Sequence, residues 1–419
     1  MSTQPIESSA PLGDPSRPRL SLCLATYNRA RYLDRYLTHH LSALDLAGVD
    51  YELVVSDNCS TDATPEILAR YAARHPRMRV TRQRENVGAY PNILTTLHQA
   101  RGEVIVSIAD DDLAVPHQLL AYVQRMIDDP ALVMIQAPWF LVDERKTNAV
   151  IGKFYHLQGE SRFERGAFAA CLAFVIEHHV FPECCLIRRS ALASIAGPTP
   201  RFTYGYFAML ANALRKGDVL FCPEPHVAAT AVARGAGEKV GNSEAMDSWD
   251  VYRGGLELLA SCARQYDPAG AADAAAVGAA ITGFVCERMA VAARLQAHAG
   301  NWSNAYQILR RLHAYGLTPA IDFPPDDVAV FAAVETMLLE CAQRGASEVV
   351  VEDTVPDHVL ERMNPVAGVR VIRAEAVGAG DVRRAFCSVG AAADPAMRGQ
   401  DFSFDIVAAI ERFPLLPEA

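Results

Sequence analysis

Three consecutive aspartates end an apolar run in the stretch SIADDDLAVP, residues 107–116. Carboxylates held this close repel one another, and the repulsion grows as they leave water. One interpretation is a solvated turn in which Asp112 caps the next helix. Another is a site for Mg²⁺ or Mn²⁺, whose charge neutralises Asp110, Asp111 and Asp112. A carboxylate pair that shares a proton would need two separate elements, which a single run does not supply.

The triplet closes the last of four apolar runs, which alternate with segments of helical spacing. This alternation predicts an α/β fold with a mostly parallel central sheet and helices on both faces. Ligands of such sheets bind beyond the carboxyl ends of the strands. Four polar turns fall at those ends, at residues 26–29, 57–62, 84–88 and 110–112. We expect them to line one crevice, where a cation could offset the charge on a leaving diphosphate, and this context favours the metal site.

The remaining sequence predicts further parts of the chain. Residues 1–18 lack an apolar core and are expected to form a disordered tail, followed by the alternating region 19–230. Residues 231–345 are alanine-rich with helical spacing, which predicts a helical region. Residues 346–419 alternate again and predict a small C-terminal α/β unit.

Charge and cysteine content narrow the class of protein. The net charge of −10 makes nucleic acid an unsuitable partner. The cysteines show no CxxC spacing, which predicts a reduced, cytoplasmic location. The apolar stretch at residues 274–286 is too short to span a bilayer, so we expect no transmembrane segment.

Six arginines lie between residues 70 and 84. For all of them except Arg84 we favour a solvated helix face and strand ends. The alternative is a patch that associates with an anionic membrane surface. A homo-oligomer is also compatible with the sequence.

Four stretches occur in order at regular spacing: LATYNRARYLDRYL, VVSDNCSTDATPEIL, ENVGAYPNI and GEVIVSIADDDLAVPHQL. Together they resemble the family-2 glycosyltransferases, which have the GT-A fold, are mostly inverting and use nucleotide-diphosphate sugars. The resemblance covers residues 19–129 and continues more thinly to about residue 230. It implies metal-dependent transfer of a sugar to a hydroxyl acceptor, which could be a glycan, a lipid-linked saccharide or a small molecule, as in polysaccharide biosynthesis.

The resemblance implies roles for the polar turns. Thr26 and Tyr27, in the first turn, would lie near the nucleotide, and Arg29 would reach the diphosphate. Asp57, in the second turn, matches the family aspartate that accepts a hydrogen bond from the base, which suits uracil, thymine or guanine. The third turn supplies two residues where the family contacts base or phosphate, namely Arg84 and Asn86.

The aspartate triplet matches the family's metal and sugar motif. Many members read Asp-x-Asp-Asp, with the first aspartate where this chain has Ala109. We favour Asp112 as the metal ligand that assists catalysis. Asp110 is placed on the nucleotide sugar and as a second ligand, with Asp111 as a close alternative.

An inverting transfer also needs a general base for the acceptor hydroxyl. The segment where many family members carry it, residues 201–214, contains no carboxylate. Glu183 is the favoured substitute, although it could instead pair on the surface with Arg188 or Arg189. His178 and His179 are nearby alternatives. His226 could complete a metal shell, or its ring could simply be satisfied by the backbone.

Two other functions fit part of the pattern. The absent carboxylate would suit a protein that binds nucleotide sugars or polysaccharides without catalysis. A sugar nucleotidyltransferase would need a glycine-rich loop after the first strand, and ATYNRARYL has no glycine.

Overall fold

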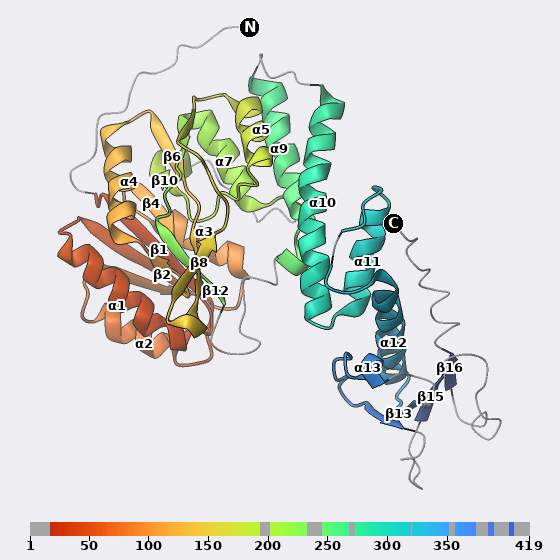
Figure 1. Ribbon diagram of the computed structural model, residues 1–419. Helices are drawn as coiled ribbons and strands as arrows, with labels where there is room; N and C mark the ends of the chain where they lie inside the picture. The colour runs from red at the N-terminus through yellow and green to blue at the C-terminus, as the bar shows by residue number, and fades with distance from the viewer. Residues whose placement is uncertain are drawn as a thin grey trace. The chain divides into compact units, whose positions relative to one another are not determined.

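The computed structural model describes residues 17–192, 202–232, 245–267, 273–319, 321–351, 357–373, 384–388 and 402–405 (Figure 1). Nearly all of the predicted tail at residues 1–18 lies outside these ranges. The chain divides into two compact units. The first comprises residues 1–239 and 250–282, and the second comprises residues 240–249 and 283–419.

The first unit is built on an eight-stranded sheet with the order β3-β2-β1-β4-β10-β6-β11-β9. Neighbouring strands β3, β2, β1 and β4 are parallel, whereas β10 runs antiparallel between β4 and β6. The α/β fold with a mostly parallel central sheet is therefore confirmed. The strands are β1 (Leu20–Thr26), β2 (Tyr51–Asp57), β3 (Met78–Arg82), β4 (Val104–Ser107), β6 (Leu132–Gln136), β9 (Ser161–Phe163), β10 (Leu186–Arg188) and β11 (Asp218–Phe221).

Helices connect the parallel strands, as the alternating pattern predicted. Their apolar faces are buried, for example through Leu33, Leu37 and Leu41 of the first helix. The helices of this unit are α1 (Ala30–Leu46), α2 (Thr64–Ala72), α3 (Ala89–Gln99), α4 (Pro116–Asp128), α5 (Phe168–Glu177), α6 (Arg189–Leu192), α7 (Gly205–Lys216) and α9 (Val251–Tyr266), with a 3₁₀ turn at Glu144–Lys146.

A second, four-stranded sheet has the order β5-β12-β7-β8. It consists of β5 (Leu113–Ala114), β12 (Val227–Val232), β7 (Phe140–Asp143) and β8 (Ala149–Lys153). Because β5 directly follows the aspartate triplet and pairs with β12, this sheet brings the triplet beside a strand more than a hundred residues later.

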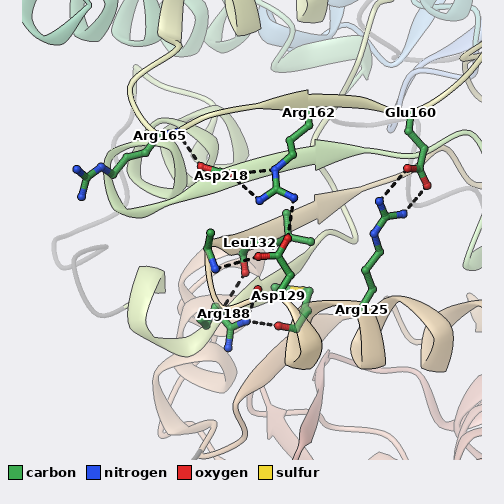
Figure 2. A network of polar contacts seen from close by, with 10 residues as sticks. Arg125, Asp129, Leu132, Glu160, Arg162, Arg165, Arg188 and Asp218 are labelled. Atoms are coloured by element: carbon green, nitrogen blue, oxygen red, sulfur yellow. Dashed lines mark hydrogen bonds and ion pairs between the residues drawn. The ribbon is translucent and has the colours of Figure 1, made fainter. Parts of the chain in front are cut away.

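A polar network joins the far half of the large sheet to α4 (Figure 2). Arg162 on β9 binds Asp129 at 2.6 Å and Asp218 on β11 at 2.7 Å. Arg188 on β10 pairs with Glu103 at 2.5 Å and also donates to backbone carbonyls at the end of α4. These contacts hold β9, β10 and β11 against the helix.

Four of the six arginines between residues 70 and 84 have carboxylate partners. The pairs are Arg70–Asp34 at 2.5 Å, Arg77–Asp45 at 3.6 Å, Arg79–Glu52 at 2.8 Å and Arg82–Asp57 at 3.4 Å. Their charges are therefore largely compensated, which favours the interpretation as ordinary strand ends and a solvated face.

Helix α10 (Ala274–His298) begins in the first unit and continues into the second, from residue 283 on. The second unit also contains α11 (Trp302–His313), α12 (Pro325–Gln343) and α13 (Asp357–Leu360). Its four-stranded parallel sheet has the order β14-β13-β15-β16. The strands are β13 (Glu348–Val351), β14 (Arg370–Arg373), β15 (Arg384–Ser388) and β16 (Phe402–Asp405). A small C-terminal α/β sheet was predicted at this place.

Helix α10 corrects the length that we assigned to the apolar stretch at residues 274–286, whereas the absence of a transmembrane segment stays a prediction. The apolar stretch that we judged too short for a bilayer belongs to a helix of 25 residues, in which an 18-residue window has a mean hydropathy of 1.4. Among the described residues, it is the one helix long and apolar enough to cross a membrane by length and composition. Core helices of soluble proteins meet the same criterion, so the helix alone does not identify a membrane segment.

Candidate active site

The first and last polar turns meet at the carboxyl ends of β1 and β4. Thr26, the last residue of β1, donates its hydroxyl proton to Oδ2 of Asp110 over 2.7 Å. Nε of Arg29 lies 3.2 Å from Oδ1 of the same carboxylate. Thr26 and Asp110 are both buried. The structure therefore brings together three residues from two turns that the sequence placed far apart, Thr26 and Arg29 from the first turn and Asp110 from the last.

The carboxyl group of Asp110 is electrostatically perturbed. Burial raises its pKa to about 7, opposed by Arg29 and the Thr26 hydrogen bond and reinforced by the charge of Asp111. A bound cation would favour the charged form of this carboxyl group. The chemistry of Asp110 therefore suits a metal ligand, or an acceptor for a nearby hydroxyl group.

The other two aspartates are anchored by residues that the sequence did not single out. The backbone N–H of Thr230 on β12 donates to Oδ1 of Asp112 over 2.9 Å, and its hydroxyl donates to the carbonyl of Asp111 over 2.9 Å. Nη2 of Arg35 donates to the same carbonyl over 2.8 Å. Burial and the charge of Asp111 raise the pKa of Asp112 above its ordinary value.

Two histidines of α1 hold the strand that follows the triplet. Nδ1 of His40 donates to the carbonyl of Tyr36 at 2.8 Å, and its Nε2 accepts from the backbone N–H of Ala114 at 3.0 Å. Nε2 of His39 lies 2.9 Å from the carbonyl of the same Ala114. Burial lowers the pKa of His40 to about 3. A neutral His40 thus sets the position of β5.

The second turn begins beside the first, because Asp57 on β2 pairs in register with Thr26. Oδ1 of Asp57 accepts the backbone N–H of Ser60 at 3.0 Å, and its Oδ2 lies 3.4 Å from Nε of Arg82. Oδ2 is buried and has no hydrogen-bond partner among the described residues. This carboxylate therefore retains an acceptor that could take a ring N–H.

Asn58 joins the second turn to the third, a role that the sequence analysis missed. Its side chain donates to Oδ1 of Asn86 at 2.8 Å and to the carbonyl of Gly88 at 3.1 Å, and it accepts from the N–H of Val87 at 2.9 Å. Asn86 is thereby positioned at the crevice. The side chains of Arg84 and Tyr27 are exposed at the same end of the sheet.

Glu183 lies beyond the same sheet edge. Strand β10 is antiparallel to β4, with Leu186 opposite Val106, so the residues that precede β10 lie past the carboxyl end of β4. The thiol of Cys184 has its pKa raised by burial first and then by the charges of Asp112 and Glu183. Both carboxylates are therefore near enough to act electrostatically on one thiol. The expected alternative partner Arg188 pairs with Glu103 instead.

A cluster of tyrosines lies beside Glu183. The hydroxyl of Tyr204 donates to Oε1 of Glu183. The ring of Tyr206 lies 5.4 Å from that of Tyr204 and 6.1 Å from that of Tyr90. Tyr90 packs against Gly205, where a Cβ atom would be 1.9 Å from its Cζ. Aromatic rings of this kind suit contacts with a sugar ring.

The histidine positions differ in their surroundings. Nε2 of His226 lies 2.8 Å from the carbonyl of Cys184, and burial lowers its pKa to about 4. Its buried Nδ1 has no hydrogen-bond partner among the described residues. The ring of His178 packs on Phe174 at 4.4 Å. His179 adopts a positive φ of 48° in the turn before β10.

The arrangement of the oxygen and nitrogen donor atoms tests whether the site could hold the expected Mg²⁺ or Mn²⁺. Within the described ranges, no group of three or more His, Cys, Asp or Glu side chains is arranged to hold a metal ion. Mg²⁺ and Mn²⁺ are commonly held by one or two carboxylates while phosphate oxygens and waters fill the remaining positions. Asp110 and Asp112 offer oxygen ligands of that kind. They fit an ion that binds together with a nucleotide, not one enclosed by protein ligands alone.

Comparison with known proteins agrees with the resemblance noted in the sequence. Residues 21–195 match the family described as Glycosyl transferase family 2. The abequosyltransferase RfbV of Salmonella typhimurium is 30% identical over 129 residues, covering 30% of this chain and 36% of the relative. The succinoglycan biosynthesis protein ExoO of Rhizobium meliloti is 34% identical over 108 residues, covering 26% and 30%. The matched part spans about a third of the length of these relatives.

Solved structures show a more distant likeness. A structure of S. aureus TarS, residues 1–349 in complex with UDP-GlcNAc, is 17% identical with a TM-score of 0.49. The likeness covers 78% of this chain and 87% of that one. At this level it adds nothing to what the sheet order and the family match already establish.

Proposed function

Because residues 21–195 belong to glycosyl transferase family 2, we propose that this protein is an inverting glycosyltransferase. It moves a sugar from a nucleotide-diphosphate donor to a hydroxyl group of an acceptor. The relatives' names refer to abequosyl transfer and succinoglycan biosynthesis, so a saccharide of a polysaccharide pathway is the acceptor that we favour.

One observation carries this proposal. The first turn, the aspartate triplet and Glu183 come from three distant parts of the chain and lie at one edge of the sheet. The 2.7 Å hydrogen bond between Thr26 and Asp110 ties the first two together. The antiparallel pairing of β10 with β4 supplies the third. We therefore assign donor-side and acceptor-side groups to a common reaction centre, as a transfer between two bound substrates requires.

The donor would lie across the first three turns. The free acceptor of Asp57 takes the ring N–H of the base, which favours uracil, thymine or guanine. Asn58 orders the third turn around Asn86, so the base is held between two fixed loops. The guanidinium of Arg29 is close enough to Asp110 to contact the diphosphate beside it.

We further propose that Asp112, with Asp110, would hold Mg²⁺ or Mn²⁺. When bound, the ion would supply charge that stabilises the departing diphosphate. The protein's own contribution is to keep these carboxylates in place through Thr230 and Arg35. His226 is the weakest of the proposed ligands, because its Nε2 already faces the Cys184 carbonyl.

Glu183 is the proposed general base. Its carboxylate takes the proton of the acceptor hydroxyl as that oxygen attacks the anomeric carbon from the side opposite the diphosphate, and the bond to the diphosphate breaks. The Tyr204 hydroxyl orients the carboxylate through its hydrogen bond to Oε1. A general base of this kind contributes about 100-fold to 10,000-fold to the rate.

Sugar transfer and donor binding, measured separately, test these assignments. UDP-sugars and GDP-sugars are screened by thermal shift with and without Mn²⁺, since a bound donor stabilises the fold. We expect Glu183→Gln to retain donor binding and lose roughly 100-fold or more in turnover. Asp112→Asn should lose the part of donor binding that depends on Mn²⁺. The exposed Glu257→Gln is the matched control and should change neither property.

Two results would contradict the proposal. If no nucleotide sugar raises the melting temperature under either condition, the donor assignment is wrong. If the unmodified protein binds a donor but transfers nothing to saccharide acceptors, a non-catalytic binding function replaces catalysis. Full turnover by Glu183→Gln would leave the transferase function intact and remove Glu183 as the base.

A further inference from the structure

A cavity of about 780 Å³ lies at the end of the large sheet that faces away from the candidate active site. Its walls include Pro18, Tyr51 and Arg77, which stand at the starts of β1, β2 and β3. Thr26 and Asp57 lie at the other ends of β1 and β2, at the edge where the aspartate triplet follows β4. Because a strand rises about 3.3 Å per residue, the length of β2 separates the two places by about 20 Å.

The charge of this cavity is opposite to that of the chain as a whole. Five arginines line it, against two carboxylates, Asp50 and Glu52. The complete chain carries a formal charge of −10. A local excess of positive charge on an acidic protein attracts anions to that one place.

Glu52 does not neutralise the cavity as a whole, because its own contacts are already complete. Its Oε1 accepts from the Ser21 hydroxyl at 2.6 Å and from the backbone N–H of Arg101 at 2.5 Å. Its Oε2 accepts from Nε and Nη2 of Arg79 at 3.1 Å and 2.8 Å. Burial acts to raise the pKa of Glu52, but these hydrogen bonds hold it below its ordinary value. The carboxylate of Glu52 therefore stays charged and balances the charge of Arg79.

The same contacts build a rigid wall. Ser21 also accepts the N–H of Gly102 at 2.8 Å, and a Cβ atom at Gly102 would lie 2.6 Å from the backbone nitrogen of Ser21. The close approach of these two backbones fixes Arg101, the neighbour of Gly102. The N–H of Arg189 donates to the carbonyl of Glu103 at 3.0 Å, which fixes the second arginine in the same way.

Arg101 and Arg189 thus have ordered backbones, while their guanidinium groups have no carboxylate partner among the described residues. Guanidinium groups bind phosphate oxygens through pairs of parallel hydrogen bonds. We propose that this cavity is a second binding site, specific for a phosphate-bearing anion, in which Arg101 and Arg189 are the principal ligands. The proposal does not depend on the transferase function.

Two sources of phosphate fit this chemistry, a soluble phosphate ester and the headgroup of an anionic lipid. Pyrophosphate is the probe for the first and is measured by equilibrium dialysis with EDTA present, so that no metal bridges it to the aspartates. Vesicles of phosphatidylcholine and phosphatidylglycerol in equal parts, compared with pure phosphatidylcholine, are the probe for the second. The full chain is used in both arms.

The decisive variants remove the two unpaired charges. Arg101→Glu combined with Arg189→Glu should bind the preferred probe at least tenfold more weakly. Arg101→Gln with Arg189→Gln removes the charges without adding new ones and should weaken binding in the same direction. The control combines Arg165→Glu with Arg264→Glu, two exposed arginines of the same unit, and has the same net charge as the first variant. It should bind as the unmodified protein does.

A further variant separates this site from the active site. Asp110→Asn removes charge from the candidate active site and should leave pyrophosphate binding in EDTA unchanged. Binding in either arm that is lost in both arginine variants supports the proposal and identifies the source of the phosphate. The absence of binding in both arms, or an equal loss in the control variant, would overturn it.

Discussion

Acidification should lower the free energy of unfolding of the first unit, because helix α1 holds His40 in its neutral form. Nδ1 of His40 donates to the carbonyl of Tyr36, so its Nε2 must accept the N–H of Ala114. A proton on Nε2 would face another N–H and break this contact. Burial is the main cause that lowers the pKa of His40 to about 3, whereas an unfolded histidine titrates near its ordinary value.

The sign and size of the effect follow from proton linkage. Between the two pKa values the unfolded chain binds a proton that the folded chain does not, so stability falls as the pH falls. The loss is about 1.4 kcal/mol per pH unit below the unfolded pKa of about 6.5. Lowering the pH from about 7.5 to about 5 therefore costs about 2 kcal/mol through His40.

Other buried groups also titrate over this pH range, and their contributions to the free energy of unfolding must be subtracted. His226, whose pKa burial lowers to about 4, adds a loss of the same sign. Asp110 has a raised pKa and acts in the opposite sense, because its folded form takes up a proton first. The comparison is therefore made between the unmodified protein and His40→Gln, which keeps an acceptor for Ala114 but does not titrate.

The assay is hydrogen exchange of the slowest amides in β1 and β2, corrected for the intrinsic rate at each pH, because these amides report opening of the first unit alone. Acidification should cost His40→Gln about 2 kcal/mol less than the unmodified protein. The exposed His117→Gln is the control and should respond as the unmodified protein does. If all three proteins lose the same stability, His40 is not held neutral and the assignment of its hydrogen bonds is wrong.

Two packing predictions can be checked by urea denaturation. Gly102→Ala should destabilise the protein by about 1–3 kcal/mol, because its Cβ would collide with the backbone of β1, whereas Gly152→Ala, with nothing within 4 Å, should be tolerated. Equal effects of the two alanines would show that β1 moves to accommodate the new atom. Arg188→Met removes the donor to the carbonyls of two buried residues, Met126 and Leu132, and should cost about 1–3 kcal/mol, while Arg125→Met breaks an exposed ion pair that contributes about 0–1 kcal/mol (Figure 2). A larger loss for Arg125→Met would contradict this account.

The sequence by itself determined the architecture of the first unit and the edge where its polar turns gather. Apolar runs that alternate with helical periodicity depend only on local spacing, and the carboxyl ends of parallel strands share one edge whatever their side chains. Thr26, Asp57 and the aspartate triplet could therefore be assigned to one crevice before any contact was known.

The tertiary structure alone decided which groups hold that crevice together. Thr230 and Arg35 anchor the triplet from positions far away in the chain, and His40 sets the strand that follows it. The cavity around Arg101 could not be predicted from the sequence either, because its walls come from separate strand starts that share no motif. Periodicity records which face of an element is buried, but a hydrogen bond between distant residues depends on strand order and register, which local spacing does not encode.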